Sequence, residues 1–146
     1  MTSVPSASLQ RFLSQRPDND QLVNPSAHVS AGAEQVGVDD LKGLIDLLPL
    51  VAAKAAKLVG ADRLKRRLDL LAQYFLETSA QGSTTERREV AFGLFYFLKG
   101  FDLIPDTVPE IGLLDDALLA ETIYQRNQLA LRSHWAARGR TWPAEA

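Results

Sequence analysis

The segment ERREVAFGLFYFLKG, residues 86–100, decides the fold of this chain. Its central part, residues 90–98, carries no charge and is apolar on nearly every side of a helix. A helix that is apolar all round is typical of a central, buried element. Ser83 and Glu86 have the spacing of a capping box that starts a helix, and Gly100 is expected to end it. We therefore predict a buried helix over residues 86–99.

Helical patterns continue on both sides of this segment. Before it, Asp39 or Asp40 can cap a helix with apolar residues in the 3.6-residue period, and Pro49 is expected to kink or break that helix. Another helix is expected to start at Asp62. After the central segment, a single last helix is expected over about residues 113–137. No segment alternates polar and apolar residues as a strand would.

These patterns predict an all-α fold, a compact bundle of four to five helices over residues 39–138. A proline-rich rigid turn is expected between the last two helices. Residues 1–38 contain three prolines and little apolar periodicity, so we expect a flexible arm with one short helix at about residues 8–15. Residues 139–146 are expected to form a frayed tail with Trp142 exposed.

Composition excludes several classes of function. The chain has 146 residues, a formal net charge of -2 and no cysteine. Disulfides, thiolate metal sites and a cysteine nucleophile are therefore excluded, and a dedicated nucleic-acid binder is not expected. We find no secretory signal and no apolar run of the roughly 20 residues that span a membrane. A cytoplasmic location is expected.

The turn FDLIPDTVPEIGLLDD, residues 101–116, is the densest motif of the chain. It holds five acidic residues, two prolines and one glycine, without a basic residue. Pro105 and Pro109 make the connection rigid, and Gly112 suits a positive φ or a close approach.

Three interpretations of these acids stay open. The carboxylates could hold a hard divalent cation such as Mg²⁺ or Ca²⁺, with Asp102, Asp106, Asp115 and Asp116 as the candidate ligands. They could instead accept backbone hydrogen bonds in turns and near the start of a helix. A carboxylate pair for acid–base catalysis is the third interpretation. No nucleophile, phosphate-loop or dinucleotide motif accompanies it, so we expect no enzyme.

From about residue 90 to 124 the chain resembles the YkvA-like family, domain of unknown function 1232. The resemblance rests on an apolar helix, an Asp-x-Ile-Pro-Asp-x-x-Pro turn, and a glycine and paired aspartates that open another helix. The matching residues are Asp102, Ile104, Pro105, Asp106, Pro109, Gly112, Asp115 and Asp116. The family has no established biochemistry. Small bacterial members and membrane-associated relatives with more apolar helices occur in it, so the resemblance implies a bacterial protein and allows membrane association.

A basic junction provides a second candidate surface. Six basic residues surround one acid, Asp62: Lys54, Lys57, Arg63, Lys65, Arg66 and Arg67. Such a cluster can contact an anionic membrane surface, although a solvated face is the simpler interpretation. Together these observations predict a non-enzymatic interaction or regulatory module that binds an unidentified protein or a second copy of itself. Metal binding and peripheral membrane association are the alternatives.

Overall fold

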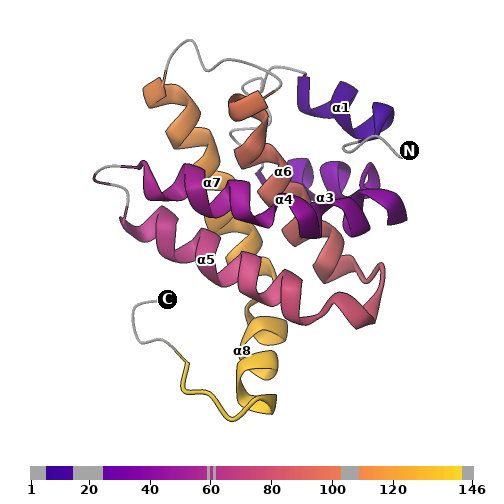
Figure 1. Cartoon of the computed structure of the whole chain (residues 1–146), viewed down its shortest axis with the longest axis vertical. Coiled ribbons are helices and arrows are strands. Elements are labelled where there is room, and N and C mark those ends of the chain that lie inside the picture. Colours follow the sequence, from indigo (N-terminus) through magenta and orange to yellow (C-terminus); the bar gives the residue numbers. More distant parts are fainter. Residues whose placement is uncertain (1–5, 15–24, 59, 61, 103–108, 143–146) are drawn as a thin grey trace.

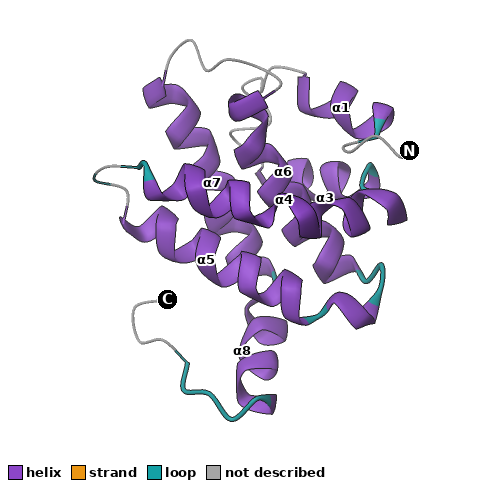
Figure 2. Ribbon diagram, viewed as in Figure 1, coloured by secondary structure: helices purple, strands orange, loops and turns teal. Residues whose placement is uncertain are grey.

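The computed structural model describes residues 6–14, 25–58, 60, 62–102 and 109–142, and within these ranges every regular element is a helix (Figure 2). The predicted all-α fold is confirmed. The α-helices are α1 (Ala7–Ser14), α3 (Pro25–Glu34), α4 (Val38–Ala56), α5 (Asp62–Glu77), α6 (Thr85–Asp102), α7 (Pro109–Arg126) and α8 (Gln128–Ala137), and a short 3₁₀ helix η1 covers Ser79–Gln81.

Helix α6 lies at the centre of the bundle (Figure 1). It packs against α1, α3, α4, α5 and α7. Every residue from Glu89 to Leu98 is buried, and Val90, Ala91, Phe92 and Leu94 have no exposed surface. The predicted central helix is therefore confirmed. Burial of apolar surface contributes about 25 cal/mol of stability for each Å², so this continuous buried stretch contributes strongly to folding.

The ends of α6 differ from those predicted. The N-cap is Thr84, whose hydroxyl accepts a hydrogen bond from the Arg87 amide at 3.2 Å. The predicted capping box of Ser83 and Glu86 is therefore wrong by one residue. The helix also continues past Gly100 to Asp102. A glycine costs only about 1 kcal/mol inside a helix, so it does not have to end one.

Two further boundaries differ from those expected. Of the kink or break expected at Pro49, the break does not occur: helix α4 continues through the proline, because buried residues such as Leu44 and Val51 hold both sides of it against the core. The single last helix expected over residues 113–137 is two helices, α7 and α8. They separate at Asn127, whose buried amide group donates hydrogen bonds to Glu89 and to the Ile123 carbonyl.

Much of the segment that the sequence assigned to an arm is helical and packed. Helix α3, which the sequence did not predict, lies against α6 and α7 and buries Val29 completely. Helix α1 falls within one residue of the predicted short helix and buries Leu9 completely. At the other end of the chain Trp142 is half-buried against Tyr124 and Trp135, so the expectation of an exposed side chain was wrong.

The close approach of α3 to α6 depends on Gly32. A β-carbon at Gly32 would overlap the ring of Phe92, which is fully buried. We predict that Gly32→Ala lowers the free energy of unfolding by about 1 kcal/mol or more, because overpacking costs about 1–3 kcal/mol and exceeds what alanine gains in a helix. Urea denaturation measures this. In a Phe92→Leu background the same substitution should cost less, and an equal cost in both backgrounds would contradict the proposed contact.

Candidate functional site

The acidic turn lies largely outside the described residues. Ile104, Pro105 and Asp106 fall in the undescribed segment 103–108, so no structural statement applies to them. Pro109 is the first residue of α7, and Gly112, Asp115 and Asp116 follow within that helix, while Asp102 is the last residue of α6. The described structure does not extend to the side chains of residues 99–116. Metal binding by the four aspartates therefore stays a prediction.

Three interhelical ion pairs dominate the electrostatics of the described residues. In the first, Arg67 of α5 binds Glu121 of α7 through Nε at 2.8 Å and lies 3.7 Å from the centre of the Tyr124 ring. Arg63 donates to the same carboxylate at 2.8 Å. Burial acts to raise the pKa of Glu121, but the hydrogen bonds from Arg67 and Arg63 outweigh it and lower the pKa to about 2.

The second pair joins the centre of the bundle to the start of α8. Glu89 of α6 is buried and accepts hydrogen bonds from Arg126 at 2.9 and 2.7 Å and from Asn127 at 3.0 Å. Burial acts to raise the pKa of Glu89, yet these donors lower it below its ordinary value. Arg126, the last residue of α7, also donates to Ser30 of α3, so its guanidinium connects α3, α6 and α7.

The third pair attaches the C-terminal end of the chain. Glu77, at the end of α5, accepts hydrogen bonds from Arg140 and from His134 of α8. Burial acts to raise its pKa, and these bonds lower it to about 2. The ring of His134 also lies edge-on to Tyr74. These contacts hold α8 at the end of the molecule opposite α1 (Figure 1).

The shifted carboxyl groups favour structure over catalysis. A general acid or base works best with a pKa near the working pH. The pKa values of Glu77, Glu89 and Glu121 instead move down, further from neutrality. Each lowered pKa is explained by hydrogen bonds from arginines in another part of the chain. Such shifts are typical of ion pairs that hold a fold together.

Several residues of the basic junction form contacts within the chain. Lys54 donates to the Phe97 carbonyl at 2.5 Å and lies over the Phe97 ring. Arg67 is buried, and it binds Glu121 together with Arg63. Among the six basic residues, Lys57, Arg63 and Arg66 are the exposed ones. The sequence contained an indication that Arg67 is buried. It lies three residues after Leu64 and four before Leu71, and so falls on the apolar stripe of α5.

Helix α1 packs against α3 and α6, and we call the surface that it covers the groove. The side chain of Leu9 is fully buried, and the ring of Phe12 stacks on His28 of α3 and meets Phe92 of α6 edge-on. At the start of α1, the Ser6 amide and hydroxyl donate to Asp40 at 2.6 and 2.9 Å. Asp40 is fully buried and also accepts the Gly37 amide at 2.9 Å, which caps α4. The sequence indicated the capping role of this residue, but not its contact with Ser6.

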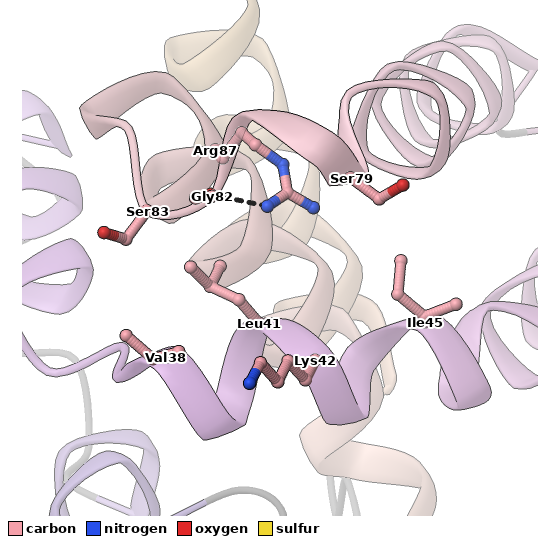
Figure 3. A pocket seen from close by; sticks show the side chains of 8 residues that line it. All are labelled: Val38, Leu41, Lys42, Ile45, Ser79, Gly82, Ser83 and Arg87. Carbon is pink, nitrogen blue, oxygen red and sulfur yellow. Dashed lines mark hydrogen bonds between the residues drawn. The ribbon is translucent and has the colours of Figure 1, made fainter.

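A separate pocket of about 250 Å³ lies between α4 and the corner that joins α5 to α6 (Figure 3). Arg87 of α6 forms part of its wall and is buried. Its guanidinium donates to the Gly82 carbonyl at 2.5 Å, to the Phe75 carbonyl at 3.2 Å and to the Thr78 hydroxyl at 3.2 Å. The other lining residues are Val38, Leu41, Lys42, Ile45, Ser79 and Ser83. This site was not predicted from the sequence, because its residues come from two stretches, 38–45 and 79–87, that are distant in the chain.

Comparison with known proteins identifies one family. A family model described as a protein of unknown function (DUF1232) matches residues 87–121. This match confirms the resemblance to domain of unknown function 1232 over that part of the chain, and the narrower YkvA-like label is not confirmed. No curated protein and no solved structure matches the chain. In the described part of the chain, no helix has the length and apolar character that crossing a membrane requires, and no three His, Asp or Glu side chains are grouped to hold a metal ion.

The Arg67–Glu121 pair should make stability depend on pH. The Glu121 pKa is about 2 in the folded chain against an ordinary 4.5, so its contribution to stability is present above pH 4.5 and is lost as pH falls toward 2. We predict that Glu121→Gln lowers the free energy of unfolding at pH 7 and flattens its decline between about pH 4.5 and 2. Urea denaturation across this range measures both effects. Glu34→Gln, at an exposed position of α3, is the control, and an equal effect of the two variants would contradict the assignment.

Proposed function

We propose that this chain is a non-enzymatic interaction module whose groove beneath α1 receives an amphipathic helix. The supporting observation is the docking of α1 itself, which occupies the groove as an intramolecular ligand. A partner protein, or α1 of a second copy, would take its place. The lowered pKa values of Glu77, Glu89 and Glu121 support a structural role for these three residues.

The length of α1 supports this proposal. The helix has 8 residues, whereas isolated helices shorter than about 12–15 residues are marginal in water. Its helical form therefore depends on the groove. Leu9 and Phe12 are three residues apart and lie on one face, which is the spacing of anchors in helix-in-groove recognition.

The polar contacts define where an occupant must begin. The Ser6 hydroxyl accepts the Leu9 amide at 3.3 Å and donates to Asp40 at 2.9 Å. The Ser6 amide donates to the other carboxylate oxygen at 2.6 Å. A bound helix thus needs a capping serine or threonine three residues before its first apolar anchor. The expected recognition pattern is Ser-x-x-Leu-x-x-Phe.

Competition by α1 makes the module regulatory. A tethered segment reaches an effective concentration on the order of millimolar at its site, so a partner must bind much more tightly than α1 or act when α1 is released. Anything that weakens the contact of Ser6 with Asp40, such as modification of the Ser6 hydroxyl, would open the groove. The module would then respond both to its partner and to the state of its own N-terminal segment.

Two alternative functions make different predictions. A Mg²⁺ or Ca²⁺ site formed by Asp102, Asp106, Asp115 and Asp116 predicts stabilisation of about 2.7 kcal/mol at a hundredfold excess over the dissociation constant, lost in Asp102→Asn. Contact of the basic junction with an anionic membrane predicts salt-sensitive sedimentation with anionic vesicles, lost in Arg66→Glu. Neither effect is expected if the groove is the functional site.

The groove can be tested with the full chain and its own α1 sequence. In Leu9→Asp/Phe12→Asp, burial of two carboxylates is prohibitive, so α1 should leave the groove vacant. We predict that a labelled peptide of residues 6–14 binds this variant and binds the unaltered chain at least tenfold more weakly, because the tethered helix competes. Fluorescence anisotropy measures both affinities.

The control chain is Ala7→Asp, which adds one carboxylate at an exposed position of α1 and should behave like the unaltered chain. A peptide with Leu9→Asp should bind neither variant. If the peptide fails to bind a vacant but folded chain, as judged by circular dichroism, the groove is not a helix-binding site. Peptide-independent dimers of the unaltered chain would instead indicate exchange of α1 between copies.

A further inference from the structure

We infer that the pocket formed by Arg87, Lys42, Ser79 and Ser83 binds a small organic oxyanion that carries a short apolar group. The pocket lies on the opposite side of the first turns of α4 from the Asp40 contact with α1, and it does not depend on the proposed function of the groove. Figure 3 shows the Arg87 side chain extending from α6 toward the space above α4.

Arg87 is a buried cation without a carboxylate partner in the described part of the chain. Only 3% of the residue is exposed, and its three hydrogen bonds all go to neutral oxygens. Burial lowers the pKa of its guanidinium below the ordinary value. Buried charges are costly unless they are paired. An anion in the pocket would supply the missing negative charge.

The contacts of Arg87 within the chain use only part of its capacity to donate hydrogen bonds. The Phe75 carbonyl and the Thr78 hydroxyl lie at the end of α5, where an arginine caps the helix and complements the negative end of its dipole. A guanidinium has five N–H donors in a fixed fork. The contacts with Phe75, Thr78 and Gly82 use three of them. The remaining N–H groups, one on each terminal nitrogen, are available to donate to a carboxylate or phosphate in the pocket.

The other lining residues fit the same ligand. Lys42 adds a second positive charge, and Ser79 and Ser83 add two hydroxyls, while none of the described lining residues is acidic. Leu41, Ile45 and Val38 form an apolar floor, and Val38 is 56% exposed. Charge at one end and apolar surface at the other select an amphipathic anion. A volume of about 250 Å³ is below the range of drug-sized sites, so the ligand is small.

Four probes test this chemistry on the full chain: hexanoate, hexyl phosphate, hexanol and inorganic phosphate. We expect hexanoate or hexyl phosphate to bind saturably and to shift the backbone amide signals of Gly82 and Ser83 in two-dimensional NMR. Hexanol lacks the charge and inorganic phosphate lacks the apolar part, so each should bind at least tenfold more weakly. The carboxylate and phosphate arms together decide which oxyanion is preferred.

Substitutions at exposed positions keep the test separate from folding. Lys42→Glu should weaken binding of the preferred probe by about fivefold or more, the effect of losing one exposed charge contact and adding a repulsive one. Arg66→Glu makes the same change of charge on an exposed residue of α5 that does not line the pocket, and it should leave the affinity unchanged. At the buried position itself, Arg87→Lys keeps the charge but not the fork, and a folded variant should bind the probe still more weakly.

Three results would overturn the inference. Hexanol that binds as tightly as hexanoate would mean an apolar pocket without anion selectivity. Equal losses in Lys42→Glu and Arg66→Glu would mean a general charge effect. The absence of saturable binding by both amphipathic probes at millimolar concentration would exclude the site. Because the probes carry no helix, these results are independent of peptide binding to the groove.

Discussion

The structure depends on the need to cover α6 on every side. A helix with one apolar stripe can lie on the surface of a bundle, but residues 89–98 present buried side chains in all directions. Five other helices, α1, α3, α4, α5 and α7, therefore contact it. Gly32 and Gly93 allow close packing, because a β-carbon at either position would overlap Phe92 or Ile123. The central helix thus determines both the number of neighbours and the positions where small residues are required.

The charged residues near the start of α6 bring a second constraint. Arg87 and Glu89 are buried with the apolar residues that follow them, and each has to be paired or hydrogen-bonded where it lies. Glu89 is paired by Arg126 and Asn127, which fixes the junction of α7 and α8. Arg87 is held by the end of α5. One of these buried groups, Arg87, also forms the charged wall of the pocket.

The sequence was sufficient where one apolar pattern dominates. It predicted the all-α fold, the central helix and the start of α5, because these follow from periodicity and capping within a few residues. It allowed a break at Pro49, which packing of the flanking residues prevents, and an end at Gly100, although a glycine weakens a helix without having to end it. It also missed α3, whose apolar residues Val29, Ala33 and Gly32 are too small and too few to show a clear stripe. The groove and the pocket could not be predicted, since each joins segments that are distant in the chain, as Ser6 and Asp40 are.

The first turns of α4 connect the two surfaces. Successive residues of a helix are turned by about 100°, so Asp40 faces α1 while Leu41 and Lys42 line the pocket. The start of this helix is fixed by the bond from the Gly37 amide to Asp40, the same carboxylate that holds Ser6. Release of α1 removes two of the three hydrogen bonds to that carboxylate and opens to water the side that Ser6 covers. The start of α4 thus supports the contact with α1 on one side of the helix and the lining of the pocket on the other.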